Sequence, residues 1–362
     1  AMQGRGPAHD LITYNAAMSA CDRGSEWERA LQLLCTLQER IGEPDAIAYS
    51  VAVSACRRGA HWEGVVSLLR EMARLGLEPN VIVYSSAISL CDWELALGLL
   101  SEMQRVGIRA NVIVYGAAIS ACERGLQWQR AMWLLQELQR RGLEANRITY
   151  NAPISACEKC GQWERALGLM RKMEEVGLEP DIVTYNAAVS ACEKGGRWER
   201  ALGLMVELRD AGLEPDVVTY SAAMTACQSG GQWERPLALL ADMQHCSLEP
   251  NVVTYSATIS ACEKGQQWEL ALVVLSGLQE DSLEPNVISY NAAISACEKS
   301  EQWERALHML AEMSELDLKP NVVSYSAALL ACLEGHGLET ALDVFDEMAR
   351  CSVDADVQSY GS

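Results

Sequence analysis

Apolar residues recur along the chain at helical spacing, in paired stripes separated by short polar breaks. Between residues 182 and 216 the first stripe follows the i, i+3, i+4, i+7 spacing of one helix face. It consists of Tyr185, Ala188, Val189 and Cys192. A Lys-Gly-Gly break follows, and a second stripe runs from Trp198 to Leu208 until a Gly-Leu-Glu-Pro sequence ends it. The pattern predicts a helical hairpin of 35 residues.

This hairpin repeats along nearly the whole chain. Successive tyrosines are 35 residues apart, except for one step of 31 residues. They are Tyr14, Tyr49, Tyr84, Tyr115, Tyr150, Tyr185, Tyr220, Tyr255, Tyr290, Tyr325 and Tyr360. Because neither helix of a hairpin can bury its stripe alone, the hairpins are expected to stack into an all-α solenoid. Its first helices would line one side and its second helices the other.

The repeats divide the chain into one array and two short flanks. We place ten repeats, numbered one to ten, in residues 11–356, with residues 1–10 as an N-terminal flank. Residues 357–362 match the start of an eleventh repeat, so we expect the chain to be a fragment of a longer one. The third repeat has only 31 residues, and we place its four missing residues in the loop between Cys91 and Trp93.

Composition is that of a globular protein, with 49% apolar and 22% charged residues. No apolar run approaches the roughly 20 residues of a membrane span, and the N-terminus lacks the apolar stretch of a signal peptide. The formal charge is -20, with an isoelectric point near 4.7. Taken alone, this charge argues against nucleic acid as a partner, because phosphate binders usually carry a basic surface.

Ten of the fourteen cysteines lie seven residues after a tyrosine. This cysteine column comprises Cys21, Cys56, Cys91, Cys122, Cys157, Cys192, Cys227, Cys262, Cys297 and Cys332. Equivalent residues of stacked helices are separated by about 8–10 Å, whereas a disulfide needs Cα atoms within about 7 Å. We therefore expect small buried packing residues in a reducing compartment, with no metal site and no cofactor.

A second line of residues follows the face of each first helix that lies away from the hairpin. Two residues before each tyrosine the side chain is always β-branched and apolar, and such side chains are stiff. This aliphatic column comprises Ile12, Ile47, Ile82, Ile113, Ile148, Val183, Val218, Val253, Ile288 and Val323. It could pack between repeats, or it could form a flat apolar wall against which bases rest.

Small polar residues alternate at two further positions, one directly after the tyrosine and one at the end of the repeat. These polar pairs are Asn15 with Asp45, Ser50 with Asn80, Ser85 with Asn111, Gly116 with Asn146, Asn151 with Asp181, Asn186 with Asp216, Ser221 with Asn251, Ser256 with Asn286, Asn291 with Asn321 and Ser326 with Asp356. Helix capping explains an Asn or Asp before each first helix. It does not explain the alternation, which changes donors and acceptors while barely changing size.

Basic residues recur nine positions after the tyrosine in seven repeats. This basic column comprises Arg23, Arg58, Arg124, Lys159, Lys194, Lys264 and Lys299. A favourable interaction with the helix dipole would account for a cation at a helix end. Together with the aliphatic column and the polar pairs, however, a basic stripe on an acidic protein favours a linear polyanion along the first-helix face.

The unit, with its Val-Thr-Tyr-Asn start, Trp-Glu-Arg-Ala-Leu second helix and Gly-Leu-Glu-Pro-Asn end, resembles the pentatricopeptide repeat in its plain form with one motif length. The likeness extends over all ten repeats. It implies a right-handed superhelical solenoid of stacked helix-turn-helix hairpins. It further implies an organellar protein, in a mitochondrion or plastid, that binds single-stranded RNA with one base per repeat and serves RNA processing, stability or translation.

In that family the polar pair recognises the base edge, the aliphatic residue sandwiches the base and the basic residue approaches the phosphate. By the family's correspondence, Asn with Asp favours U, Asn with Asn favours C, Ser with Asn favours A and Ser with Asp favours G. The implied target is 5′-UAANUUAACG-3′. The fourth base stays open because Gly116 has no side chain, and the tenth repeat departs from the pattern at Glu334 and Leu338.

Two other functions were weighed against RNA binding. A protein-interaction scaffold of the tetratricopeptide type would suit the negative charge. Catalysis within the chain is not expected, since the five histidines are scattered and no phosphate-binding loop, dinucleotide fingerprint or deaminase signature occurs. Protein partners, or a nuclease or deaminase domain of the kind some family members carry, would lie outside this chain.

Overall fold

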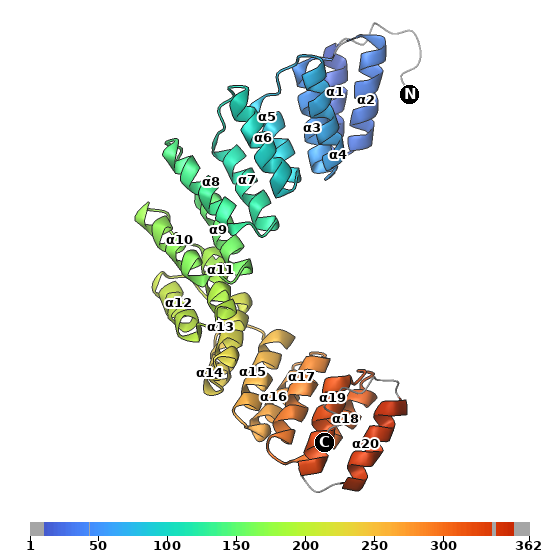
Figure 1. The fold of residues 1–362 in the computed structure, drawn as a ribbon, viewed down its shortest axis with the longest axis vertical. Helices are drawn as coiled ribbons and strands as arrows, with labels where there is room; N and C mark the ends of the chain where they lie inside the picture. Colours follow the sequence, from blue (N-terminus) through green and yellow to red (C-terminus); the bar gives the residue numbers. More distant parts are fainter. Residues whose placement is uncertain (1–10, 43, 335–337, 351–362) are drawn as a thin grey trace. The chain divides into compact units, whose positions relative to one another are not determined.

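The computed structural model describes residues 11–42, 44–334 and 338–350, which form twenty α-helices and no strand. The chain divides into two compact units, residues 1–179 and 180–362, and each is described by itself (Figure 1). Unit 1, coloured blue to green, contains α1 (Leu11–Arg23), α2 (Trp27–Arg40), α3 (Ala46–Arg58), α4 (Trp62–Arg74), α5 (Val81–Leu90), α6 (Trp93–Arg105), α7 (Val112–Arg124), α8 (Trp128–Arg140), α9 (Arg147–Lys159) and α10 (Trp163–Glu175).

Unit 2, coloured yellow-green to red, continues the same alternation of first and second helices (Figure 1). It contains α11 (Ile182–Lys194), α12 (Trp198–Asp210), α13 (Val217–Ser229), α14 (Glu234–His245), α15 (Val252–Lys264), α16 (Trp268–Glu280), α17 (Val287–Glu298), α18 (Trp303–Glu315), α19 (Val322–Glu334) and α20 (Leu338–Arg350). Odd-numbered helices are the first helices of the hairpins and even-numbered helices the second. The expected all-α helical repeat fold is confirmed.

Within each unit the first helices form a continuous layer. In unit 1, α1 packs on α3, and α3, α5, α7 and α9 follow in order; in unit 2 the order is α11, α13, α15, α17 and α19. Within a unit, each second helix packs on the first helix of its own hairpin and on that of the next hairpin of the same unit. No two second helices of the described chain approach as closely as neighbouring first helices do. The first-helix layer therefore fixes the spacing between repeats.

The predicted apolar stripes form the core of this layer. Tyr185, Ala188, Val189 and Cys192 of α11 are all buried, as are their counterparts in the second to tenth repeats. In the first repeat Tyr14 and Met18 are buried, whereas Ala17 and Cys21 are half-buried. The tyrosine ring is enclosed while its hydroxyl reaches the last turn of the preceding second helix. Gln139 Nε2, for example, donates to the Tyr150 hydroxyl at 2.8 Å.

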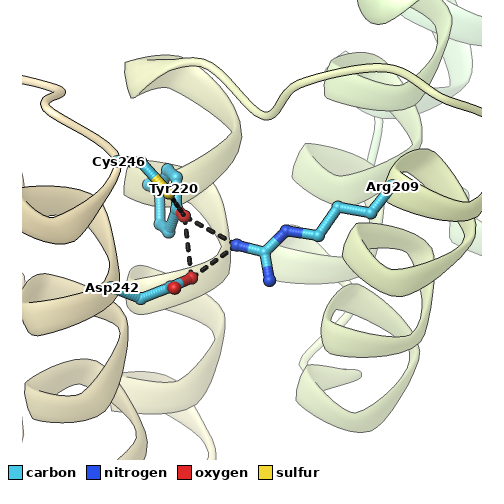
Figure 2. Close-up of polar contacts among 4 residues, drawn as sticks. All are labelled: Arg209, Tyr220, Asp242 and Cys246. Atoms are coloured by element: carbon cyan, nitrogen blue, oxygen red, sulfur yellow. Dashed lines mark hydrogen bonds and ion pairs between the residues drawn. The ribbon is translucent and has the colours of Figure 1, made fainter.

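Polar contacts of the tyrosine hydroxyl tie three helices together in repeats six and seven (Figure 2). Arg209 of α12 donates to the Tyr220 hydroxyl of α13 at 2.7 Å and also forms an ion pair with Asp242 of α14. The Tyr220 hydroxyl in turn donates to Asp242 Oδ2 at 2.8 Å and lies 3.9 Å from Cys246 Sγ. Burial and the bond to Asp242 raise the pKa of Tyr220, so the hydroxyl keeps its proton at neutral pH.

Tryptophan and glycine set the offset between repeats. Trp27 of α2 lies so close to Gly59 in the next repeat that a Cβ added there would be 2.2 Å from Trp27 Cδ1. The equivalent contact between Trp198 and Gly230 is also 2.2 Å. Real Cβ contacts essentially never come this close, so any residue larger than glycine at this position would clash with the indole ring. The glycine that follows the first helix thus has a packing role as well as ending the helix.

The deletion in the third repeat falls mainly in a helix, not in the loop as expected. First helix α5 has 10 residues and ends at Leu90, whereas α3 and α7 on either side each have 13. The chain turns within two residues, and the side chain of Asp92 caps α6 by accepting from the Leu95 amide at 2.9 Å. The loss removes the last turn of α5 together with part of the loop.

The described part of the cysteine column packs as expected from Cys56 onward, with burial raising the pKa of most of these thiols. Cys157 and Cys160 also have C-x-x-C spacing, which our sequence analysis overlooked. Cys157 is fully buried with a pKa of about 12, and Cys160 Sγ donates to the Leu126 carbonyl at 3.4 Å. No group of metal-binding side chains occurs among the described residues, and none of the described helices is long and apolar enough to cross a bilayer.

Candidate nucleic-acid interface

The aliphatic column is exposed in every repeat. Its side chains occupy the second position of each first helix and are between 56% and 75% exposed, from Val253 at the lower end to Ile12 at the upper end. Packing between repeats, one of the two interpretations open from the sequence, would have buried them. The first-helix layer of each unit therefore exposes one stiff apolar side chain per repeat.

The Asn and Asp residues at the repeat ends cap the first helices. The side chains of Asp45, Asn80, Asn111, Asn146, Asp181, Asp216, Asn251 and Asn286 each accept from the backbone amide of the third helical residue. Asn321 does the same with the Ser324 amide at 3.1 Å. Capping fixes one oxygen of each of these side chains and leaves the remaining polar atoms for other partners.

In three repeats the capping side chain also contacts the second member of the polar pair across the repeat boundary. Asn186 Nδ2 donates to both carboxylate oxygens of Asp216 at 3.1 Å. Asn291 Nδ2 donates to Asn321 Oδ1 at 3.2 Å. Asn80 Nδ2 donates to Ser50 Oγ at 3.3 Å in the same way. The structure thus brings together residues 30 positions apart, beside the aliphatic column.

Three of the serine members of the polar pairs donate their hydroxyl protons to their own helices. Ser50, Ser221 and Ser256 each donate to the carbonyl four residues earlier in their own helix, at 2.7 Å. Their hydroxyl oxygens therefore have lone pairs, and no proton, available for a ligand. Ser256 is the most enclosed of these serines at 9% exposure. At Gly116 an added Cβ would make an ordinary 3.6 Å contact with Thr149 Cγ2, so the position tolerates a side chain.

For two polar pairs, the members lie in different units or partly outside the described residues. Asn151 is half-buried in α9 of unit 1, and Asp181 caps α11 of unit 2. Ser326 is half-buried in α19, while its partner Asp356 lies outside the described residues, as do the predicted N-terminal flank and the start of the eleventh repeat.

The basic column makes contacts that the sequence analysis missed. Each basic residue lies at the end of its first helix, and five of the seven reach back to the preceding repeat. Lys159 pairs with Glu123 at 2.9 Å and Lys299 with Glu263 at 2.7 Å, and these lysine side chains are 39% and 38% exposed. Arg58 likewise pairs with Asp22 at 3.1 Å. An acid stands directly before the basic residue in six of the seven repeats, Arg58 being the exception, and this recurring acid was the available signal.

Two further members of the basic column bind carbonyl oxygens. Arg124 donates to the Ser89 and Cys91 carbonyls at 3.0 and 3.2 Å, where the shortened α5 leaves its C-terminal carbonyls unsatisfied. Lys264 donates to the Gln228 carbonyl at 3.0 Å. Arg23 and Lys194 occupy the last turns of α1 and α11. The column is therefore a row of partly neutralised cations.

A layer of first helices that carries one exposed apolar side chain, one polar pair and, in most repeats, one cation defines a helical-repeat solenoid with a repeating surface. Comparison with protein families agrees. The profile described as pentatricopeptide repeat domain matches residues 67–124, 133–197 and 238–300, more than half of the chain. The PPR repeat family profile matches 180–229 and 285–334, and the PPR repeat profile matches 113–143. The chain belongs to the pentatricopeptide repeat family.

Solved structures show the same fold. PPR10 in complex with an 18-nucleotide psaJ RNA element superposes with a TM-score of 0.64 at 19% identity, covering 97% of this chain and 57% of that one. PPR10 from maize gives a TM-score of 0.51 at 21% identity, covering 98% of this chain and 61% of that one. This chain thus spans less than two thirds of the length of PPR10. A comparison with curated protein sequences gives no significant match.

Proposed function

We propose that this chain binds single-stranded RNA in a sequence-selective manner, with one base per repeat. The exposed aliphatic column is the observation that carries the proposal, because an apolar side chain beside a polar pair in every repeat suits a stacked base with one readable edge. The PPR10 structure was determined with RNA bound, which agrees with this assignment.

The chemistry of the polar pairs supports the base preferences. Asp216 is an acceptor only, so with Asn186 it suits the N3–H donor of uracil. In the pair of Asn291 with Asn321, capping occupies Asn321 Oδ1 and leaves Nδ2 as a donor, which suits the N3 acceptor of cytosine. The serines offer lone pairs to the amino group of adenine. The proposed target is accordingly 5′-UAANUUAACG-3′.

The basic column would hold the phosphates, with an electrostatic contribution smaller than its seven members suggest. Seven phosphate contacts on a single strand would give a salt slope of roughly -0.7 × 7, about -5. Arg58, Lys159 and Lys299 already pair with acids of this chain, so RNA exchanges one anion for another at those sites. We expect a slope shallower than -5.

Fluorescence anisotropy with the ten-mer and a scrambled ten-mer tests the proposal. We expect tighter binding of the ten-mer. Equal affinity for both would contradict the base preferences, and absence of binding to either RNA at low salt would contradict RNA binding itself. We further propose that the chain acts by binding alone, without catalysis of its own, in RNA processing, stability or translation within a mitochondrion or plastid.

A further inference from the structure

The third residue of each first helix carries a hydroxyl in some repeats and an apolar side chain in others. The hydroxyl residues in the described helices after α7 are Thr149, Thr184, Thr219, Thr254, Ser289 and Ser324. Ala48, Val83 and Val114 occupy the same place in α3, α5 and α7. Every one of these positions is buried, and each lies at the boundary with the preceding repeat. The partner that the hydroxyl takes depends on the residue after the tyrosine in that preceding repeat.

After the sixth and ninth repeats, which carry asparagine, the hydroxyl contacts the amide oxygen of that asparagine. Thr219 Oγ1 lies 2.5 Å from Asn186 Oδ1. Ser324 Oγ lies 2.6 Å from Asn291 Oδ1. In both cases the opposite end of the amide donates to the capping residue of the pair. The asparagine is therefore held at both ends by the next repeat.

Where the preceding repeat carries serine or glycine, the hydroxyl donates to the backbone carbonyl of its own capping residue instead, whereas the Thr219 and Ser324 hydroxyls can donate only to the side-chain oxygen of theirs. Thr254 Oγ1, which follows Ser221, donates to the Asn251 carbonyl at 2.7 Å. Ser289 Oγ, after Ser256, and Thr149 Oγ1, after Gly116, make the same bond at 2.9 and 2.8 Å.

The direction of each hydrogen bond around Asn186 follows from the cap. The Asp216 carboxylate can only accept, so the Asn186 amide must turn Nδ2 toward it. Asn186 Oδ1 then faces the Thr219 hydroxyl at 2.5 Å. The hydroxyl also lies 2.9 Å from Asp216 Oδ1, but its one proton goes to the nearer amide oxygen. If the amide flipped, its oxygen would face the carboxylate, and two acceptors would repel each other. The Thr219 hydroxyl thus completes a chain of contacts that fixes the orientation of the Asn186 amide.

The first repeat shows the arrangement without the hydroxyl. Ala48 occupies the third position of α3, and Asn15 Oδ1 is buried with no hydrogen-bond partner among the described residues. An unpartnered buried amide oxygen is unfavourable. Its occurrence next to an alanine, and its absence next to Thr219 and Ser324, point to the hydroxyl as the group that the asparagine requires.

We propose that Thr219 and Ser324 are positioning residues for base selection in the repeats that precede them. Each fixes the amide of the asparagine that faces the base, although its own side chain is buried and does not face the RNA. This inference rests on the proposed RNA-binding function. It adds a third residue to the polar pair, required in repeats with asparagine and dispensable in repeats with serine.

Thr219→Val and Thr254→Val form a matched pair of test variants. Both remove a buried hydroxyl that also accepts from the amide of its capping residue, at 3.2 Å from Asp216 and 3.0 Å from Asn251. Both should therefore lower the melting temperature by similar amounts. Thr219→Val alone should lower the preference for uracil at the sixth base, by about fivefold. Thr254→Val should leave the preference for adenine at the seventh base within about twofold of wild type.

Ala48→Thr supplies the reverse test, because it offers the missing donor to Asn15 Oδ1. It should raise the preference for uracil at the first base and raise the melting temperature. Anisotropy titrations with ten-mers that carry each of the four bases at positions 1, 6 and 7 measure all three variants.

The outcomes separate this inference from the proposed function. Wild-type protein without preference at the sixth base would overturn both. Wild-type preference that Thr219→Val leaves unchanged would overturn only the role of the hydroxyl. A rise in melting temperature of Ala48→Thr without a change at the first base would also overturn it, since the hydroxyl would then be structural alone.

Discussion

Replacing Asp216 by asparagine should change the base selected by the sixth repeat from uracil to cytosine. Asp216 caps α13 through the Thr219 amide at 2.9 Å, and asparagine caps equally well, so the fold should be retained. The Asn186 amide would keep a bond to the remaining oxygen, as Asn291 does with Asn321 at 3.2 Å. The second carboxylate oxygen becomes an amide, which turns an acceptor into a donor.

The expected change in RNA affinity follows from replacing a matched contact between the polar pair and the sixth base by a mismatched one. Such contacts discriminate by about 1–3 kcal/mol on DNA, which corresponds to about 5- to 150-fold in affinity. We expect Asp216→Asn to lose at least about fivefold for uracil and to gain about as much for cytosine at the sixth base. Adding Asn186→Ser should move the preference to adenine, because the seventh and eighth repeats carry that combination.

Competition anisotropy with four ten-mers that differ only at the sixth base measures the shift. Glu207→Gln is the control, since it removes the same charge from an exposed position on α12. The control should bind all four RNAs more tightly by a similar factor. Uracil preference that survives Asp216→Asn would refute the role of the polar pair, and an equal shift in Glu207→Gln would show that net charge is the cause.

Four further results are expected. Val218→Ser should weaken RNA binding about tenfold without lowering the melting temperature, because Val218 is 58% exposed; a lower melting temperature would mean that the side chain supports the fold. Glu263→Gln releases Lys299 from its 2.7 Å contact, and a salt titration should show tighter binding and a slope steeper by about 0.7. Tyr220→Phe should lower the free energy of unfolding by about 1 kcal/mol, measured by urea denaturation, with base selection unchanged. Burial raises the pKa of six thiols of the cysteine column from 9.0 to about 11, so the folded state holds these protons more tightly than the unfolded chain does. The free energy of unfolding should therefore be unchanged below about pH 9 and should fall as the pH rises toward 11. Melting curves at pH 8 and pH 10 can check this.

The helices and most of the site positions were predictable from the sequence, since each depends on residues close together in the chain. The stripe from Tyr185 to Cys192 lies on one face because a helix repeats every 3.6 residues, whatever the rest of the chain does. The aliphatic column and the polar pairs followed from comparing repeats with one another. Whether Val183 is buried or exposed did not follow, because both faces of a first helix carry apolar residues.

The sequence by itself therefore determined the hairpin, its repetition and which side chains share a face. Only the tertiary structure decided what each face meets across a repeat boundary: that Lys299 pairs with Glu263, that Thr219 holds Asn186 and that Thr254 turns away from Ser221. These partners are separated by about one repeat length, and their contact depends on the offset at which rigid hairpins stack. That offset is set by packing, such as the contact of Trp198 with Gly230, and not by the local periodicity of either helix.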